Sequence, residues 1–544
     1  MKRYRWAAWG DVNAFFGLML DNVAVMVLFV TLITGKDLFT PQFVLTRMIP
    51  GTALGVLLGD LVYTWMAFRL ARRGNNPEVT AMPLGLDTPS VFGVALLVVL
   101  PALVEGKQLF PGDHDRAMLF AWHVGVVVLV LSGLFKVACA PFGNAVRRWV
   151  PRAGLLGSLA AIALALIAFM PLLTDIASVP VAGMAVLTVI LITLVAHRAL
   201  PYKVPGALAA VVLGALLVFG GRLLGDALAI PVVPGGMHAG EGASLSLPAL
   251  SPFTTLEWDW WRGVLLAALA KMPVALPFAL ATIVGGIDCT ESAAAAGDEY
   301  DTRTVLLTEA VAALVAGLLG GVIQTTPYIG HPAYKTMGGR AAYTLATALF
   351  VGAVGCLGVF GVLFEWLPPV AMFPILVFVG LEITAQSFKA TPQKHYAAVA
   401  FAFLPTLAYL VLIQMEAALG DRDPDPRAAV AVQTLRCLAS GFIVTSLLWA
   451  AALAALLDGR LRWSAAYLGV AGVLALFGVI HSPLRGSPID WPWDVYRWLP
   501  DRPEVRCQSP YHWAAAYALA AAVLIGLSFF REQRERTVPE SPGA

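Results

Sequence analysis

Charged residues are scarce in this chain of 544 residues. They make up 13% of it, whereas apolar residues make up 59% and the mean hydropathy is +0.78. A soluble protein carries about 25% charged residues, with which it covers its surface. The 36 basic and 34 acidic residues leave a formal net charge of only +2, which gives no reason to expect nucleic acid as a partner. These shortages exclude a string of soluble domains and indicate a chain that crosses a lipid bilayer many times.

Cysteine is rare as well: the five are Cys139, Cys289, Cys356, Cys437 and Cys507, and four of them lie within or beside apolar runs. No two of them form a C-x-x-C pair, which favours neither a disulfide framework nor a zinc site. The sequence also lacks a phosphate-binding P-loop, residues at metal-ligand spacing and a nucleophile–base motif. We therefore expect no cofactor, no metal and no ATP-driven transport by this chain alone.

Apolar runs long enough to span a bilayer recur along the whole chain. A spanning helix needs about 20 apolar residues, and this measure yields about sixteen segments. The first, near 12–34, contains polar residues and no small-residue cleavage site, so we expect a helix and not a removable signal peptide. Basic residues follow the even-numbered segments, and the positive-inside rule therefore predicts cytoplasmic N- and C-termini. We expect a multi-pass protein of the cell (inner) membrane.

Two short stretches with proline and glycine resemble each other. Residues 80–89 read TAMPLGLDTP and residues 324–332 read QTTPYIGHP. Each has a proline in an extended run, then a glycine, then a polar residue and a proline that opens a short helix. These helices are the third and the tenth segments, and an odd offset of seven gives the two halves opposite orientations. Inverted repeats with matching broken helices are typical of secondary transporters, whose substrate site lies near the bilayer midplane. The alternative is that both stretches are ordinary turns between helices at the membrane interface.

Ionisable side chains inside apolar segments are candidate site residues, because each costs about 2.5–3.5 kcal/mol to insert. Asp288 and Glu291 lie three residues apart, on one face of a helix, where two carboxyls can hold and exchange a proton. Alternatively, they lie at a helix end that the acidic loop 298–301 helps to solvate. His331 could donate to a substrate, relay a proton or simply face water.

The matching place in the first repeat is occupied by Asp87 and Thr88, and Asp87 could instead cap its helix. Other polar residues in apolar segments are more simply explained as structural ties that pair with one another: Asp21 with Asn22, Asp60 and Lys271. A further set of acidic residues is expected to make helix-end or inter-helix contacts: Glu309, Glu365, Glu382 and Glu416.

Taken in order, the motifs resemble the nucleobase–cation symporters (the nucleobase–ascorbate transporter family), which include xanthine/uracil permeases. They are most similar to the adenine/guanine/hypoxanthine permease branch. GLDT at 85–88 resembles that branch's Gly-Leu-Asn-Ala, and Asp288 with the following CT resembles its Asp-Thr motif on helix eight. The run QTTPY at 324–328 is similar to the Thr-rich, Tyr-containing strand before helix ten. The resemblance spans residues 10–457.

This resemblance implies an all-α polytopic membrane protein with a 7+7 inverted repeat, short strands before half-helices 3 and 10, and about two extra C-terminal transmembrane helices. Segments 1–4 and 8–11 would form a core domain, and segments 5–7 and 12–14 a gate domain. The corresponding ranges are 1–150 and 263–366 for the core, 151–225 and 367–457 for the gate, 226–262 for an extracellular loop, and 458–544 for the extra segments and a cytoplasmic tail.

The resemblance also implies a substrate site between the two strands. Asp288 would hydrogen-bond a planar base and couple to a proton, with Glu291 and His331 as further proton-coupling candidates. The remaining substrate-binding candidates are Asp87, Thr88, Thr325, Thr326, Tyr328, Gly330 and His331. The helix-ten carboxylate of many relatives is missing, because Gly330 or His331 stands in its place, and Asp87 replaces the usual asparagine.

The sequence therefore predicts a permease and not an enzyme. We expect a symporter that takes up a nucleobase or similar planar heterocycle together with a proton, or with sodium, by alternating access. We also expect a homodimer. The alternative is an anion transporter of the sulfate-permease type on the same architecture. Its half-helix dipoles would hold an anion, although Asp87 and Asp288 would repel one. Less favoured is a membrane-embedded enzyme with acid–base residues, and a channel has no evident ring of carbonyls or charges to support it.

Overall fold

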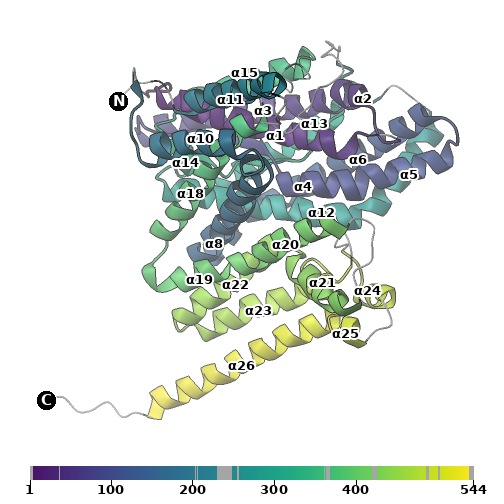
Figure 1. Ribbon diagram of the computed structural model, residues 1–544. Coiled ribbons are helices and arrows are strands. Elements are labelled where there is room, and N and C mark those ends of the chain that lie inside the picture. Colours follow the sequence, from purple (N-terminus) through teal and green to yellow (C-terminus); the bar gives the residue numbers. More distant parts are fainter. Residues whose placement is uncertain are drawn as a thin grey trace. The chain divides into compact units, whose positions relative to one another are not determined.

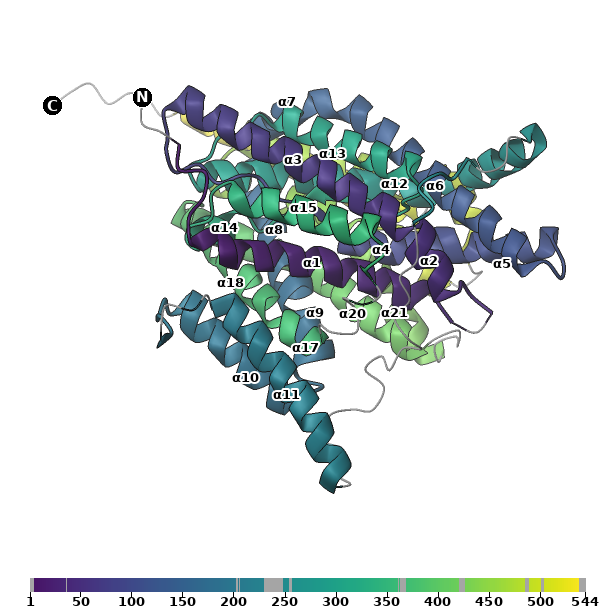
Figure 2. The same cartoon turned by 90° about the horizontal axis from the view of Figure 1, so that it is seen from above.

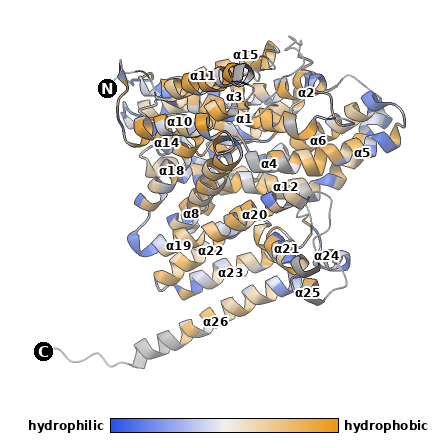
Figure 3. Cartoon of the chain, viewed as in Figure 1, coloured by the Kyte–Doolittle hydropathy of each residue, from blue (hydrophilic) through white to orange (hydrophobic). Residues whose placement is uncertain are grey.

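A computed structural model describes residues 4–35, 37–201, 204, 206–228, 248–253, 257–360, 362, 368–419, 426–484, 489–499 and 503–537. The chain forms two compact units (Figure 1): Met1–Val146 with Ala163–Gln386, and Arg147–Ile162 with Ser387–Ala544. Apolar residues dominate the helices, while the connection between α5 and α6 is among the most hydrophilic parts (Figure 3). Most of the loop predicted at 226–262 lies outside the described residues.

The elements of the first unit follow one another in chain order, with α7 and α18 running across its boundaries. They are α1 (Gly10–Ile33), α2 (Pro41–Arg47), α3 (Ile49–Gly74), β1 (Leu84–Leu86), α4 (Thr88–Gly93), η1 (Val94–Val99), α5 (Leu100–Leu109), α6 (His114–Cys139), η2 (Ala140–Phe142), α7 (Gly143–Trp149), η3 (Ala163–Ala168), α9 (Phe169–Pro171), η4 (Leu172–Ile176), α10 (Pro180–Ile190), η5 (Leu191–Val195), α11 (Gly206–Leu228), α12 (Trp258–Ala295), α13 (Thr302–Leu318), β2 (Thr325–Pro327), α14 (His331–Thr336), α15 (Ala342–Cys356), α17 (Pro369–Met372) and α18 (Pro374–Lys389).

Among the described residues, seven helices are long and apolar enough to cross a bilayer, and up to nine if each of two bent helix pairs is one span. Three shorter apolar helices accompany them: Pro180–Val195, Ala342–Cys356 and Leu461–Leu476. The third and tenth predicted segments begin with the short helices α4 and α14, each preceded by a three-residue strand. The predicted all-helical membrane fold with strands before its two half-helices is therefore confirmed.

The packing of the first unit has an internal two-fold pattern. One half runs α1–α3–β1–α4–α6 and the other α12–α13–β2–α14–α15. Each of three contacts in the first unit has a counterpart related by the repeat. The pair α3–α15 corresponds to α13–α6, the pair α1–α15 to α12–α6, and the pair α1–α14 to α12–α4. Figure 2 shows α15 between α1 and α3. The equivalent strands β1 and β2 pair antiparallel, as a two-fold axis between inverted repeats requires.

The second unit contains α8 (Arg152–Ile162), η7 (Gln393–His395), α19 (Tyr396–Phe401), α20 (Phe403–Leu419), α21 (Pro426–Ala439), α22 (Phe442–Leu457), α23 (Leu461–Leu476), α24 (Pro492–Trp498), α25 (Pro503–Arg506) and α26 (Pro510–Thr537). Here α22 packs against α8 and α23, and α23 packs against α26. The chain bends by 73° between α21 and α22. Gly441 lies at this bend with a φ of 64°, and a side chain there would meet the carbonyl of Val479 at 2.2 Å. Helices α23 and α26 are the two extra C-terminal segments that the sequence predicts.

Candidate functional site

Strand β1 is extended backbone inside a helical bundle, where its polar groups need partners from the protein. The carboxylate of Asp60 on α3 accepts a hydrogen bond from the Leu84 amide at 2.8 Å. The Asn22 amide on α1 donates to the Leu84 carbonyl at 3.4 Å. Asp60 and Asn22 are thus structural ties, as expected, but they hold the strand and do not pair with each other.

The two strands lie in the register Leu84↔Pro327, Gly85↔Thr326 and Leu86↔Thr325. Two further backbone hydrogen bonds extend the pair, from the Asp87 amide to the Gln324 carbonyl at 3.1 Å and from the Tyr328 amide to the Pro83 carbonyl at 2.8 Å. The two Pro/Gly motifs singled out in the sequence therefore lie against each other, with a short helix starting directly after each.

Asp87 is the N-terminal cap of α4. Its carboxylate accepts hydrogen bonds from the Ser90 amide at 2.9 Å and from the Ser90 hydroxyl. This is the capping alternative that the sequence left open, and it directs the carboxylate toward its own helix. The side chain of the neighbouring candidate, Thr88, lies outside the described side chains.

The side chains of β2 alternate between two environments, as strand geometry requires. Thr325 is buried, and its hydroxyl donates to the Glu309 carbonyl of α13 at 3.2 Å. Thr326 points to the other side and is partly exposed. The thiol of Cys289 on α12 donates to the Pro327 carbonyl at 3.3 Å. Of these candidates, Thr326 is therefore the one whose side chain is not fully buried.

A buried ion pair lies behind β2. The ammonium of Lys136 on α6 is 2.7 Å from the Glu309 carboxylate and 3.1 Å from the Thr325 carbonyl. The two side chains are 1% and 0% exposed. The sequence analysis expected an inter-helix contact from Glu309 but missed Lys136, which lies near the C-terminal end of its apolar segment and so gives little signal.

The start of α14 is occupied by aromatic rings. The rings of Tyr328 and Tyr334 are stacked with centroids 6.1 Å apart. A Cβ atom at Gly330 would lie 2.6 Å from the Tyr328 ring and 2.8 Å from the Tyr334 ring. No side chain fits at Gly330 unless these rings move, so this position has no room for the carboxylate that many nucleobase permeases carry there.

Asp288 and Glu291 both lie on the buried part of α12, next to the residue that contacts β2. Asp288 is 0% exposed and Glu291 5% exposed. One residue further, Ser292 donates from its hydroxyl to the Gln386 side chain at 3.0 Å. The alternative in which these carboxyls lie at a water-facing helix end is wrong, because this end of α12 is buried.

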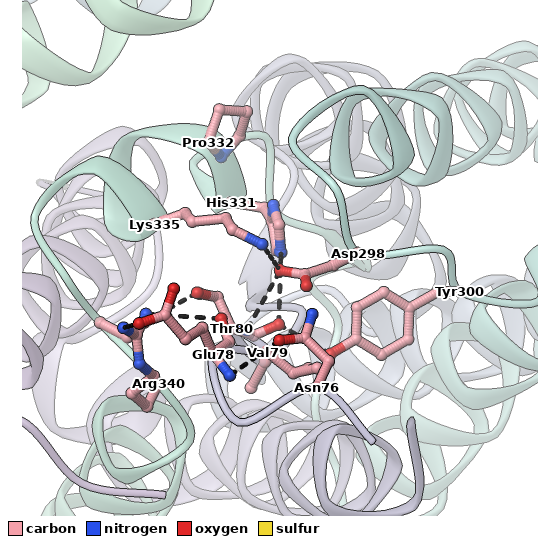
Figure 4. Close-up of polar contacts among 12 residues, drawn as sticks. Asn76, Glu78, Val79, Thr80, Asp298, Tyr300, His331, Pro332, Lys335 and Arg340 are labelled. Atoms are coloured by element: carbon pink, nitrogen blue, oxygen red, sulfur yellow. Dashed lines mark hydrogen bonds and ion pairs between the residues drawn. The ribbon is translucent and has the colours of Figure 1, made fainter. Parts of the chain in front are cut away.

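His331 belongs to a second polar cluster, which centres on Asp298 (Figure 4). The Asp298 carboxylate lies 2.6 Å from the Lys335 ammonium and 3.2 Å from the His331 imidazole, and it accepts from the Thr80 amide at 3.0 Å. The Tyr300 hydroxyl donates to the Thr80 carbonyl at 2.7 Å. His331 is 1% exposed and therefore does not face water.

This cluster fixes the charge of Asp298. Burial by itself would raise the pKa of Asp298, but its contacts with His331 and Lys335 lower that pKa below its ordinary value. The acidic loop at 298–301 is thus only partly solvated: Asp298 is buried, whereas Asp301 is exposed and caps α13 by accepting from the Thr304 amide at 2.9 Å. The cluster ties this loop to the extended chain that precedes β1.

The predicted tie at Lys271 has a different partner. Its ammonium lies 2.8 Å from the Glu105 carboxylate of α5, and not beside Asp21 or Asp60. Asp21 lies instead beside the Tyr328 and Tyr334 hydroxyls. Within the described part of the chain, no three His, Cys, Asp or Glu side chains are grouped so that they could hold a metal ion.

No known family profile matches this chain, and no curated protein matches it. Solved structures do. The transmembrane domain of a cyanobacterium bicarbonate transporter, BicA, is 16% identical with a TM-score of 0.41, covering 76% of this chain and 97% of that one. SLC26A9 is 12% identical (TM-score 0.40; 75% and 64% covered), and murine Slc26a9, an anion transporter in the inward-facing state, is 13% identical (TM-score 0.40; 77% and 69% covered).

These similarities are too weak to carry an argument about substrate. They do overturn the predicted family: the solved structures that match are described as bicarbonate and anion transporters and not as nucleobase permeases, so the assignment to the nucleobase–cation symporters is wrong. The coarser prediction stands, because the chain has the fold of a multi-pass membrane transporter.

Proposed function

We propose that this protein is a secondary active transporter that carries a small anion across the cell membrane by alternating access, with its binding site beside the β1–β2 pair. The observation that carries the proposal is the pairing of the two Pro/Gly-broken motifs at the centre of an inverted repeat. Broken helices at membrane depth are tolerated where the backbone is buried or lines a cavity, and in transporters they line the substrate site.

Two features of the strand pair favour an anion. The carboxylate of Asp87 caps its own helix, and Gly330 leaves no room for a carboxylate at the start of the other. Behind β2 lies the ammonium of Lys136, whose field acts through the strand toward the partly exposed Thr326. The repulsion that Asp87 was expected to exert is thereby reduced, because its charge is offset by the helix N-terminus.

The charge balance near the strands supports movement of the anion together with a proton. Among the described residues, Lys136 is the one lysine or arginine in the buried set, whereas the carboxyls of Asp21, Asp60, Asp288 and Glu309 are all buried. Buried carboxyls that outnumber the buried cations are costly to keep ionised, because each is removed from water. Such a cluster stays in the membrane at low cost only when protons, or a bound cation, neutralise part of it.

Alternating access would follow from movement of the core, residues 1–150 and 263–366, against the gate, residues 151–225 and 367–457. The strand pair belongs to the core, so a bound anion would move with it. Asp288, Glu291 and His331 remain proton-coupling candidates in this proposal, and Thr325, Thr326 and Tyr328 substrate-site candidates.

Uptake by the purified full-length chain in proteoliposomes tests the proposal. Radiolabelled chloride, sulfate and formate are offered under an inward proton gradient, with uracil as a neutral, planar control. We expect at least one of the three anions to accumulate and uracil not to. Thr326→Val should raise the half-saturating anion concentration, whereas Thr188→Val, on an exposed face of α10, should not. Accumulation of uracil without any anion would overturn the proposal.

A further inference from the structure

The ion pair between α6 and α13 is not required merely to pack these helices. The inverted repeat offers a direct comparison, because α3 and α15 are the counterparts of α13 and α6. There the link is neutral: the hydroxyls of Thr64 and Thr344 lie 2.8 Å apart. A buried ion pair contributes little net stability, since desolvating both charges offsets their attraction. The charged version in the second half therefore calls for a reason beyond stability.

The Glu309 carboxyl has one oxygen engaged and one open. Its Oε1 contacts the Lys136 ammonium at 2.7 Å. Its Oε2 accepts no hydrogen bond of ordinary geometry among the described residues, because the nearby Thr282 hydroxyl donates to the Ala279 carbonyl at 2.9 Å. A Cβ atom at Gly286 would lie 3.1 Å from this oxygen. The open oxygen has room for a proton beside an established cation.

Titratable and polar groups face Glu309 from each element packed around it. They are Lys136 on α6, Tyr63 on α3, Asp87 at the start of α4, Thr282 and Cys289 on α12, with Asp288 beside Cys289, and Thr325 on β2. Lys136 is the one cation in this set, and Glu309 is the carboxyl in direct contact with it, at 2.7 Å, whereas Asp87 acts on it from farther away. The state of Glu309 therefore has the largest effect on how far the Lys136 charge is balanced.

From this arrangement, and resting on the anion transport proposed above, we propose that Glu309 is the coupling proton site and that Lys136 transmits its protonation to the anion site. A proton adds to the open oxygen of Glu309 and converts the carboxylate to a neutral acid. The Lys136 ammonium, which donates to the Thr325 carbonyl, then loses the carboxylate that it contacts directly. An anion bound on the Thr326 side of the same strand supplies the missing negative charge.

Charge is balanced at each step of this cycle. One proton and one negative charge enter the site together, and loss of the anion leaves an unpaired ammonium that drives Glu309 to release its proton. Because an unpaired buried charge costs several kcal/mol, each ligand strongly favours binding of the other. Each also raises the affinity for the other by the same factor, since the coupling is reciprocal.

The test separates transport from coupling. Full-length protein in proteoliposomes is assayed with radiolabelled chloride, sulfate and formate in two ways: exchange at equal pH on both sides, and accumulation driven by a proton gradient. In the wild type we expect the half-saturating anion concentration to fall about tenfold for each unit of decreasing pH. In Glu309→Gln, exchange should persist without this pH dependence, and gradient-driven accumulation should fall at least tenfold.

Two controls make the result specific. Glu105→Gln removes the carboxylate of the partly exposed pair with Lys271, and its pH dependence should match the wild type. If Glu309→Gln does not fold, the double variant Lys136→Gln with Glu309→Gln, which leaves no buried charge of this pair, replaces it and should likewise exchange anions independently of pH. Proton-driven accumulation at wild-type level in either variant would overturn the inference. Absence of anion exchange in the wild type would instead overturn the proposed function.

Discussion

Replacing Asp298 with asparagine tests whether the cluster of Figure 4 holds the first unit together. The carboxylate contacts Lys335 at 2.6 Å, His331 at 3.2 Å and the Thr80 amide at 3.0 Å, and Asp298 is 1% exposed. Asparagine has nearly the same size and can still accept from the Thr80 amide. The substitution therefore removes the charge and leaves the packing in place.

The expected loss follows from the two contacts that depend on charge. A hydrogen bond to a charged group contributes about 1.5–3 kcal/mol. The Lys335 side chain is 22% exposed and can partly recover its solvation, whereas His331 is buried. Discounting the first contact for solvent, we expect Asp298→Asn to lower the free energy of unfolding by about 2–4 kcal/mol. The matched control is Glu78→Gln: Glu78 is 71% exposed and 3.5 Å from Arg340, so its loss should be about 0.5 kcal/mol or less.

The measurement is thermal unfolding in detergent, followed by tryptophan fluorescence. One kcal/mol shifts the melting temperature by about 2–4 °C in a unit of 150–250 residues, and by less in a larger one. We therefore expect Asp298→Asn to melt roughly 3–8 °C below the wild type and Glu78→Gln within about 1 °C of it. Equal melting temperatures for the two variants would refute the argument.

The same experiment has a pH dependence of known sign. Since the pKa of Asp298 in the folded protein is below its unfolded value, its charge stabilises the fold fully above an unfolded pKa of about 3.9. That contribution is lost as the pH falls through the folded-state pKa. The difference in melting temperature between the wild type and Asp298→Asn should have its full size at pH 6 and should vanish as the pH falls below about 4. A difference in melting temperature that persists in acid would indicate that the substitution disturbs packing and not charge.

Two further substitutions test the strand pair and the cap of α13. Gly330→Ala places a methyl group 2.6 Å from the Tyr328 ring, so we expect a loss of about 1–3 kcal/mol in melting experiments together with slower anion uptake. The control Gly263→Ala, inside α12 with nothing within 4 Å, should leave uptake unchanged and raise stability by up to about 1 kcal/mol. Asp301→Ala removes the hydrogen bond to the Thr304 amide and should cost about 1 kcal/mol, whereas Asp301→Asn should keep most of the stability. An undiminished melting temperature for Asp301→Ala would show that the cap contributes nothing.

Much of the fold could be predicted from the sequence, because long apolar runs report bilayer spans directly. The two Pro/Gly motifs were equally informative. A proline that removes a backbone donor inside an apolar stretch requires a break in the helix, and finding the same break twice at an odd offset requires two halves of opposite orientation. What the sequence did not contain was the substrate. The motifs around Gly85 and Gln324 describe the architecture of the strand pair and are silent about the ligand.

The charged clusters were harder to predict because their partners are distant in the chain. Asp298 contacts Thr80, 218 residues away, and no local pattern distinguishes it from a solvated acid. Lys136 lies in the last turn of its helix, where a lysine usually extends its ammonium to the membrane surface. Asp87 is the opposite case: an aspartate directly before a helix that opens with proline is a local signal for an N-cap, and the capping alternative could be weighed from it.

The two halves of the repeat support their strands by different means, and this difference bears on how transport is coupled. In the first half, β1 is held through its own backbone, by the Asp60 carboxylate on the Leu84 amide. In the second half, β2 is held by an ammonium, which donates to the Thr325 carbonyl and is balanced by Glu309. The helices are equivalent and the backbone pairing is symmetric, so the fold alone does not require this asymmetry. In the cycle proposed above, the second strand is the one whose electrostatic environment changes when a proton binds to Glu309 or leaves it. An inverted repeat supplies two exchangeable conformations, and under the proposed coupling a charge pair on one side lets a proton determine when the anion is bound.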